Sequence, residues 1–293
     1  MAMRLVAWAL ALSVSSSLTS KKPFTHRVVV KHVPAWVPHE RLLGDGAWQP
    51  EDGGLACDLT TRNACDLAAR LRGVGLGGRK LDVVATPKLP RAAVRGARLE
   101  DARRRRTTSL GFARRGARLD VEGRWSLTPE RLALDVGARA NRKSVVDATC
   151  GCGGNAIGFA RAGCAVLAVD VDRRRLDLAR HNAKLYGVDI TFACGDATKL
   201  PEDRSADVLF VDPPWGVDWN KTATPLSALP LLEDLLALAR RRSFRRVLAK
   251  VPPSFDPATV PGAAAEAIFG HEAGDYRRVK FVLLDVDVSR GST

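Results

Sequence analysis

The chain has 293 residues, of which 46% are hydrophobic, enough for one sizeable core and an accessory region. Its formal net charge of +14 and its isoelectric point near 10.1 set it apart from an ordinary globular protein. Two explanations stay open: a polyanionic partner such as nucleic acid, whose phosphates attract basic surfaces, or an arginine- and alanine-rich composition inherited from the genome.

The six cysteines do not form a metal-binding pattern. Cys150 and Cys152 flank a single glycine, Cys164 and Cys194 lie in apolar runs, and no C-x-x-C pair occurs. This spacing argues against a zinc site and against a disulfide framework. We therefore expect a reduced, intracellular protein without a bound metal.

The first twenty residues combine features of two kinds of targeting segment. Arg4 precedes an apolar run from Leu5 to Val14, and no acidic residue occurs before Glu40. The run is too short to span a bilayer, so we expect no stable membrane association. Basic, acid-poor sequence is typical of an organellar presequence, and the apolar run is typical of a signal peptide. Residues 1–20 are a candidate targeting segment, with a mature strand or tail as the alternative.

Residues 21–110 are expected to form an α+β accessory region with a candidate RNA-binding role. Strands are predicted at 27–31 and 80–85, and a helix at 61–72 that the following glycines end. The region closes with the run Arg103–Arg106. These arginines are expected either to contact RNA phosphates or to form a solvated helix face.

From residue 128 onwards, apolar strands alternate with helices. Thr128, Pro129 and Glu130 are typical of a helix start. Almost wholly apolar strands predict a doubly wound, mostly parallel sheet with its ligand at the carboxyl ends of the strands. We therefore expect residues 111–293 to form a Rossmann-like α/β domain. Strands are predicted at 144–150, 164–170, 189–194, 206–212, 245–251 and 278–288, and helices at 155–162, 173–186, 226–241 and 257–268.

The segment from Asp147 to Asn155 joins the first of these strands to its helix through three glycines, which allow the backbone to approach a nucleotide-like ligand. Asp147 is placed to receive an ammonium group, Asp170 to accept from two ribose hydroxyls, and Asp196 to accept from an adenine amino group. The glycines lack the G-x-G-x-x-G spacing of a dinucleotide site, so S-adenosyl-L-methionine is the expected cofactor. The predicted cofactor-binding residues are Thr128, Asp147, Cys150, Gly151, Gly153, Asn155, Asp170 and Asp196.

Asp212, Pro213, Pro214 and Trp215 follow the 206–212 strand and form the predicted catalytic segment. The exocyclic amine of a nucleobase is conjugated and poorly nucleophilic, so it needs acceptors that orient its lone pair and take its proton. The Asp212 carboxylate and the Pro213 carbonyl can provide them, and the prolines fix the backbone. Stacking of a base on Trp215 is worth about 1–3 kcal/mol, and a cationic base adds roughly 0.5–2 kcal/mol. A proline turn over a core tryptophan is the structural alternative.

Several segments resemble the trimethylguanosine synthase family, the RNA cap guanine-N2 methyltransferases. The resemblance covers roughly residues 110–250 and is carried in register by 116–130, 145–155, 168–172 and 179–187. It implies a class I S-adenosylmethionine-dependent enzyme in the nucleus that methylates the 7-methylguanosine cap of small nuclear RNA or another structured RNA. It also implies that Trp215 stacks the cap guanine and that Trp125 and Ser126 line the other side.

Two departures from the family keep other functions open. The family usually has serine where Asp212 stands and a second glycine where Val217 follows Gly216, and the region before residue 110, with its run Arg103–Arg106, has no evident counterpart in the cap enzymes. Asp-Pro-Pro before an aromatic is common in enzymes that methylate base amines within tRNA, rRNA or DNA. An internal guanine of rRNA or tRNA, in a plastid or mitochondrion if residues 1–20 are a presequence, is therefore the second substrate. A non-catalytic RNA-binding module is the alternative of another class.

Two further residues complete the predicted substrate site. Trp219 is expected to form either a second stacking wall or a packing contact. Lys250, near the end of the 245–251 strand, is expected to reach a phosphate. The predicted substrate-binding residues are Trp125, Ser126, Trp215, Trp219 and Lys250.

Overall fold

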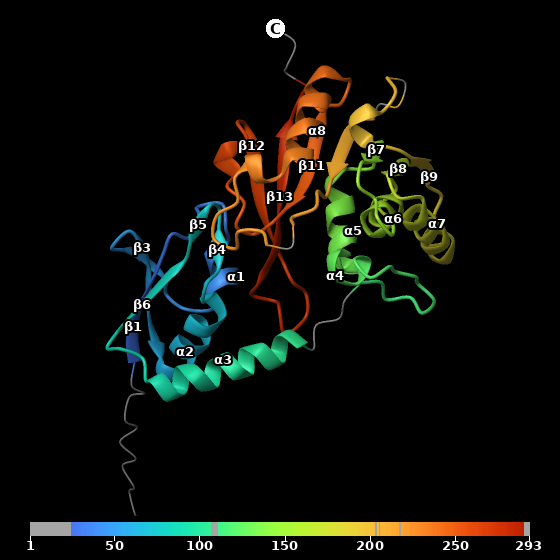
Figure 1. Ribbon diagram of the computed structural model, residues 1–293. Helices are drawn as coiled ribbons and strands as arrows, with labels where there is room; N and C mark the ends of the chain where they lie inside the picture. Colours follow the sequence, from blue (N-terminus) through green and yellow to red (C-terminus); the bar gives the residue numbers. More distant parts are fainter. Residues whose placement is uncertain (1–24, 107–110, 203, 205, 217, 290–293) are drawn as a thin grey trace, which may run out of the picture.

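The computed structural model describes residues 25–106, 111–202, 204, 206–216 and 218–289 (Figure 1). The candidate targeting segment at residues 1–20 lies outside these ranges. No helix within them is both long and apolar enough to cross a membrane.

Residues 25–106 form an antiparallel sheet of strand order β2-β3-β1-β6, packed against two helices. Val28 and Val30 alternate inwards from β1 and pack with Leu67 and Leu71 of α2. The predicted strand over 80–85 is in fact two short strands. The elements are β1 (Thr25–Lys31), α1 (His39–Leu43), β2 (Gln49–Glu51), β3 (Gly54–Thr60), α2 (Thr61–Leu71), β4 (Gly75–Leu76), β5 (Arg79–Lys80), β6 (Asp82–Thr86) and α3 (Arg91–Arg106).

The second part of the chain contains a seven-stranded sheet of order β12-β13-β11-β10-β7-β8-β9. The five strands from β11 to β9 run parallel, and β13 and β12 are antiparallel to their neighbours. The predicted doubly wound, mostly parallel Rossmann-like α/β fold is confirmed. Its elements are α4 (Gly123–Ser126), α5 (Glu130–Arg139), β7 (Val145–Asp147), α6 (Gly154–Arg161), β8 (Val166–Asp170), α7 (Arg173–Tyr186), β9 (Thr191–Cys194), β10 (Val208–Val211), α8 (Pro230–Arg241), β11 (Arg246–Val251), β12 (Ala263–Phe269) and β13 (Val279–Asp287).

Helices cover both faces of this sheet because its central strands are apolar on both sides. Leu209 and Val211 of β10 pack in one core cluster with α8, whereas Phe210 packs in the other cluster with α5, α6 and α7. Both faces are thereby closed, and the carboxyl ends of the parallel strands are left as the open edge where a ligand can bind.

The predicted helix over 257–268 is wrong. Pro257–Thr259 forms a single 3-10 turn, and Ala263–Phe269 is strand β12, an edge strand paired with β13 over its whole length. The alanines of this segment favour a helix locally, but pairing with β13 provides hydrogen bonds that override this weak preference. The first predicted strand of the domain also ends earlier, at Asp147 rather than at residue 150.

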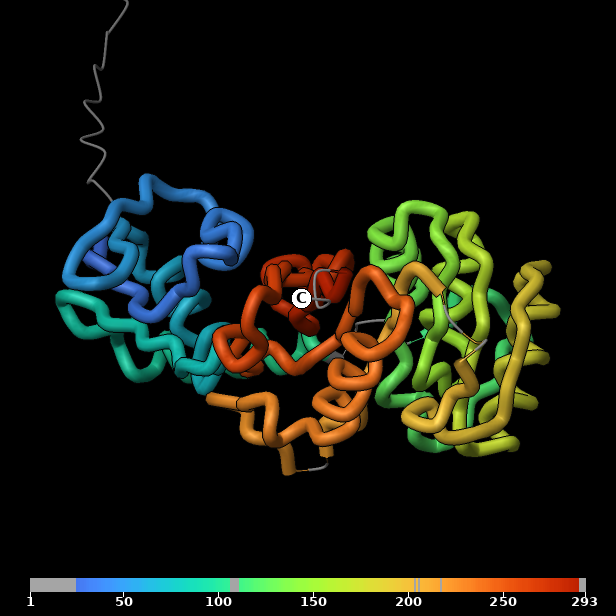
Figure 2. The backbone as a smooth tube through the Cα atoms, turned by 90° about the horizontal axis from the view of Figure 1, so that it is seen from above, coloured from blue at the N-terminus to red at the C-terminus, as the bar shows by residue number. Residues whose placement is uncertain are grey.

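The N-terminal sheet region is attached to the β12–β13 hairpin and to the loops next to it. The Arg41 guanidinium donates to the backbone carbonyls of Tyr276, at 2.7 Å, and Gly270, at 3.0 Å. Asp101 on α3 is ion-paired with Arg278 at the start of β13. Figure 1 shows the N-terminal region beside the hairpin, and the view from above in Figure 2 shows the hairpin between that region and the parallel strands.

Helices α5 and α6 cross so closely that a side chain at Gly158 would clash. A Cβ at this position would lie 2.3 Å from the Ala133 carbonyl oxygen. We predict that Gly158→Ala destabilises the protein by about 1–3 kcal/mol because the two helices must separate. The measurement is the thermal unfolding midpoint by circular dichroism.

Gly96→Ala is the matched control for this prediction. Gly96 lies in exposed helix α3, where a Cβ would meet no atom within 4 Å. Alanine there should raise stability by roughly 0.5–1 kcal/mol, because it favours the helix more than glycine does. A Gly158→Ala midpoint equal to that of Gly96→Ala would contradict the close crossing.

Candidate active site

The loop after β7 is shaped by glycines in left-handed conformations. Gly151 has φ of +53° and Gly153 has φ of +91°, values that L side chains rarely adopt. A Cβ at Gly153 would also lie 3.1 Å from the Ala179 Cβ on α7. The loop therefore packs directly on α7 and turns into α6 at the carboxyl edge of the sheet.

Asp170, the last residue of β8, holds this loop in place. One carboxylate oxygen accepts from the Gly151 N–H at 2.8 Å, and the other accepts from the Asp172 N–H at 2.9 Å. Each oxygen keeps a second lone pair, so the predicted bonds to ribose hydroxyls are compatible with this role. The residue thus fixes the glycine loop as well as lying beside the expected cofactor.

Asp147, at the end of β7, is fully buried and only partly satisfied. Its Oδ1 accepts from the Thr149 N–H at 3.3 Å, whereas Oδ2 has no hydrogen-bond partner among the described residues. Burial raises the pKa of this carboxyl to about 8, and the negative charges of Asp212 and Asp170 act in the same direction. A bound ammonium group would favour the carboxylate and satisfy the free oxygen.

Of the five buried side-chain polar atoms without a partner within the described part of the chain, four belong to predicted site residues and the fifth is Arg278 Nε. The four are Asp147 Oδ2, Thr128 Oγ1, Asn155 Oδ1 and the indole Nε1 of Trp215. An unpaired buried polar group costs about 1–3 kcal/mol, so such groups are rare unless something binds to them. Of these four atoms, Asp147 Oδ2 and Asn155 Oδ1 are acceptors, Trp215 Nε1 is a donor, and the Thr128 hydroxyl is both. This set fits a ligand with an amino-acid end and a heterocycle, as S-adenosylmethionine and a nucleobase provide.

The predicted catalytic residue Asp212 lies just beyond β10 and is tied to three neighbours. Its Oδ2 accepts from the Lys250 ammonium at 2.7 Å and from the Asn155 amide at 3.4 Å. Its backbone N–H donates to Thr149 Oγ1 at 2.8 Å. Burial raises the pKa of the Asp212 carboxyl, and the charge of Lys250 acts in the opposite direction.

Lys250 is not placed as the sequence predicted. It was expected to reach a phosphate, but its side chain is only 7% exposed and its ammonium is engaged within the protein. Besides Asp212, it donates to the backbone carbonyl of Ser126 at 3.2 Å. Lys250 therefore joins the catalytic segment to helix α4. The sequence shows only a lysine near a strand end, and this does not indicate that its partners are Asp212 and the Ser126 carbonyl.

The tryptophans of the predicted substrate site differ in exposure. Trp215 is half-buried and packs against both core clusters, with the Lys250 ammonium 5.6 Å from its ring centroid. Trp219 contacts Trp215 edge-on, with 5.6 Å between ring centroids and 74° between planes. Trp125, next to Ser126 on α4, is 78% exposed. A half-buried indole and an exposed indole thus lie on the two segments that Lys250 links.

The remaining predicted residues have mixed environments. The Cys150 side chain is buried in the core, so only its backbone is available to a ligand. Asp196 follows β9, where its Oδ1 accepts from the Thr198 N–H and hydroxyl, and these bonds lower its pKa. The neighbouring Gly195 N–H donates to the Asp170 carbonyl at 3.0 Å, which brings this turn beside the β8 end. Pro213 is buried and Pro214 is exposed.

Sequence reasoning missed Asn182, which fastens the segment before α4 to the glycine loop. This fully buried α7 side chain accepts from the Arg118 N–H at 2.8 Å and donates to the carbonyls of Arg118, at 2.8 Å, and Cys152, at 2.9 Å. Arg175, one helical turn from Asp172, pairs with Asp120 at 2.9 Å. A polar residue on the inward face of a helix was the only indication, and it did not identify these partners.

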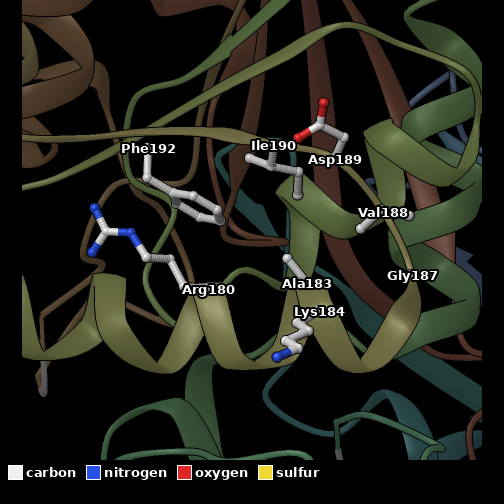
Figure 3. A pocket seen from close by; sticks show the side chains of 8 residues that line it. All are labelled: Arg180, Ala183, Lys184, Gly187, Val188, Asp189, Ile190 and Phe192. Atoms are coloured by element: carbon white, nitrogen blue, oxygen red, sulfur yellow. The ribbon is translucent and has the colours of Figure 1, made fainter.

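A surface hollow of about 690 Å³ lies elsewhere, between α7 and β9 (Figure 3). Its lining contains none of the predicted site residues. In Figure 3 the Phe192 ring and the Arg180 side chain lie side by side, with 5.3 Å between guanidinium carbon and ring centroid. Neither this hollow nor any other group of acidic, histidine or cysteine side chains in the described ranges could hold a metal ion.

Comparison with known proteins finds a family whose model matches the part of the chain that carries most of this site. Residues 142–224 match a family model described as RNA cap guanine-N2 methyltransferase. The resemblance found in the sequence is thus confirmed, and the family uses S-adenosyl-L-methionine, the cofactor expected from the glycine loop.

Two curated relatives extend the match. The chain is 32% identical over 157 residues to a trimethylguanosine synthase of Schizosaccharomyces pombe, covering 48% of this chain and 65% of the relative. It is 29% identical over 136 residues to a trimethylguanosine synthase of Saccharomyces cerevisiae, covering 39% and 43%. The chain therefore spans less than two thirds of the length of either relative.

A solved structure is also similar. It is an RNA methyltransferase from Salinibacter ruber in complex with S-adenosyl-L-homocysteine, with a TM-score of 0.39 and 17% identity, covering 56% of this chain and 94% of that one.

The raised pKa of Asp147 predicts that cofactor binding releases a proton. Near pH 7 the free carboxyl is mostly protonated, because its pKa is about 8. A ligand ammonium stabilises the carboxylate, so the proton leaves on binding. Titration calorimetry with S-adenosylhomocysteine in buffers of different ionisation enthalpy should show a release approaching one proton.

Asp147→Asn should abolish this release and weaken binding. Asp196→Asn is the control, because the pKa of Asp196 is lowered and its carboxylate is already ionised. A binding enthalpy of the unmodified protein that is the same in every buffer would contradict the role given to Asp147.

Proposed function

We propose that this protein is an S-adenosylmethionine-dependent RNA methyltransferase that modifies the N2 amine of guanine in a 7-methylguanosine cap. The observation that carries the proposal is that the predicted site residues Thr128, Asp147, Asn155 and Trp215 each have a buried polar atom without a partner among the described residues. The family match of residues 142–224 supports the same chemistry. Residues 111–293 would form the methyltransferase domain, and 21–110 an accessory region.

In this proposal the cofactor is held by the glycine loop and by carboxylates at three strand ends. Asp147 receives the ammonium of the methionine portion, Asp170 accepts from the ribose hydroxyls, and Asp196 accepts from the adenine amine. Asn155 and Thr128 offer further polar atoms beside the loop. When bound, S-adenosylmethionine supplies an electrophilic methyl group, so the protein needs only to place and polarise the acceptor amine.

The guanine is held by aromatic contact and by two oxygen acceptors. Trp215 presents a face to the base, and Trp125 is exposed on the helix that Lys250 fastens to the same segment. The Asp212 carboxylate and the Pro213 carbonyl accept from the N2 amine and orient its lone pair. Asp212 then takes the proton that the amine loses. Its burial raises its pKa, which improves it as a base, while the charge of Lys250 acts in the opposite direction.

A second substrate is favoured by one specific observation. Asp212 stands where the cap enzymes usually have serine, and its charge is matched by buried Lys250. Asp-Pro-Pro is common in enzymes acting on amines of internal bases, so an internal guanine of rRNA or tRNA is the alternative. A cap substrate would place the enzyme in the nucleus, and an internal one in an organelle if residues 1–20 are a presequence.

The proposal is tested by transfer of a radiolabelled methyl group to three acceptors: 7-methylguanosine cap analogue, capped RNA and uncapped RNA of the same sequence. The cap proposal expects labelled N2-methylguanosine from the first two. Label in uncapped RNA alone would replace the cap with an internal guanine. Cofactor binding without transfer to any acceptor would favour a non-catalytic RNA-binding module.

Trp215 and Asp170 should separate catalysis from cofactor binding. Trp215→Ala removes the stacking face and should lower transfer at least a hundredfold, consistent with about 1–3 kcal/mol of stacking plus lost orientation. Its affinity for S-adenosylhomocysteine should stay within about threefold. Asp170→Ala frees the Gly151 N–H and should weaken cofactor binding first. Loss of cofactor affinity in Trp215→Ala would mean that its role is misassigned.

The Asp212–Lys250 pair predicts a shift in the pH dependence of transfer. Lys250 lowers the pKa of Asp212, so Lys250→Met should raise it. Activity that requires the carboxylate is lost as pH falls through this pKa. The acid limb of the kcat profile should therefore move to higher pH.

Lys280→Met is the matched control, because Lys280 forms an ion pair with Asp275 at 2.9 Å in the β12–β13 hairpin. Its acid limb should not move. If Lys250→Met keeps the original acid limb while remaining folded by circular dichroism, Asp212 is not the titrating base.

A further inference from the structure

Helix α3 carries an unusual concentration of arginine for a helix outside the methyltransferase domain. Its sequence, Arg91–Arg106, contains seven arginines and two acidic residues. Sixteen helical residues extend about 24 Å. The helix packs on α2 and runs along one side of the molecule from the N-terminal region towards α4 (Figure 1).

The two faces of α3 differ in what they contact. Asp101 is 8% exposed and is ion-paired with Arg278, the residue before β13, and with Arg105, the latter at 3.2 Å. Arg91, Arg95 and Arg98 are exposed, and none of them forms an ion pair with a described residue. Their spacing of four and three residues places them on one helix face. We call these three residues the arginine stripe.

The arginine stripe is unfavourable in the isolated protein. Like charges three or four residues apart destabilise a helix by about 0.2–0.5 kcal/mol per pair. Both acidic residues of α3 are engaged elsewhere, since Glu100 pairs with Arg104 at 3.3 Å and Asp101 with Arg278. A bound polyanion would relieve this repulsion, and guanidinium groups match phosphate oxygens through paired hydrogen bonds.

The carboxyl end of α3 is close to the proposed base site. A Cβ at Gly274 of the hairpin would lie 2.5 Å from the Arg104 carbonyl oxygen. Five peptide links join Arg106 to Gly111, so their Cα atoms are at most about 18 Å apart. A Cβ at Gly111 would be 3.3 Å from Leu127 Cδ2, the residue that follows Ser126. The carboxyl end of α3 therefore borders the hairpin and leads towards α4, and the arginine stripe lies further back along the same helix.

We propose that the arginine stripe binds the phosphates of the RNA downstream of the methylated guanine. This inference rests on the proposed function, and it extends it by assigning a second, sequence-independent contact to the accessory region. The apolar residues nearest the arginines on this face are Val94 and Ala102, both only partly exposed, and Leu99 is the one large apolar side chain exposed on α3. An amphipathic membrane-binding helix would need a broad apolar face, so RNA is the partner that the face fits.

The test compares Arg95→Gln/Arg98→Gln with Arg240→Gln/Arg241→Gln, two exposed arginines of α8 on the other part of the molecule. Binding is measured by fluorescence anisotropy with a labelled, uncapped 20-nucleotide RNA at several salt concentrations. The stripe variant should bind on the order of tenfold more weakly at 0.1 M salt. Its salt slope should fall by about 1.4, because each lost phosphate contact removes about 0.7. The α8 variant should match the unmodified protein.

Activity gives an independent readout. For capped 20-nucleotide RNA the stripe variant should show a KM about tenfold higher with kcat unchanged, whereas kinetics with a cap dinucleotide should be unaltered. Equal affinities and slopes for both variants, or binding of the stripe to anionic vesicles rather than RNA, would overturn the inference. If no guanine is methylated but the stripe variant still loses RNA affinity, the proposed function fails and the docking surface stands.

Discussion

The buried ion pair between Asp212 and Lys250 is the contact on which the geometry of the site depends. It joins β10 to β11 at their carboxyl ends, and through the Ser126 carbonyl it also holds helix α4. Removing one partner of a buried pair costs about 3–5 kcal/mol, since a charge is left without compensation. The two segments that carry Trp215 and Trp125 are therefore fixed relative to each other before any ligand binds.

The same edge of the sheet gathers acidic side chains in an otherwise basic protein. The chain carries a net charge of +14, yet Asp147, Asp170 and Asp212 gather at the strand ends. Of these three carboxylates, Asp212 alone is paired with a cation among the described residues, and burial raises the pKa of Asp147. On the proposed function, a cationic cofactor completes this acidic centre, while the surrounding arginines are left for the phosphates of the RNA. On this proposal the carboxylates lie inside the site and the arginines lie on the surface.

The sequence predicted the features that depend on neighbouring residues, and it did not predict contacts between residues far apart in the chain. The parallel strands, the glycine loop and the acidic strand ends were visible because hydrophobic runs and glycines are local features. The partner of Lys250, 38 residues from Asp212, and the clamp formed by Asn182 depend on tertiary contacts that no local pattern encodes. The edge strand Ala263–Phe269 was mistaken for a helix for the same reason, because its pairing with β13 decides its conformation.

The most direct measurement of the central claim is a crystal structure with S-adenosylhomocysteine and a 7-methylguanosine cap analogue bound together. The account predicts the purine against the Trp215 ring, with its N2 about 3 Å from the Asp212 carboxylate or the Pro213 carbonyl. The cofactor ammonium should contact Asp147 Oδ2. A purine bound away from Trp215, or an Asp147 carboxyl that still lacks a partner in the complex, would contradict it.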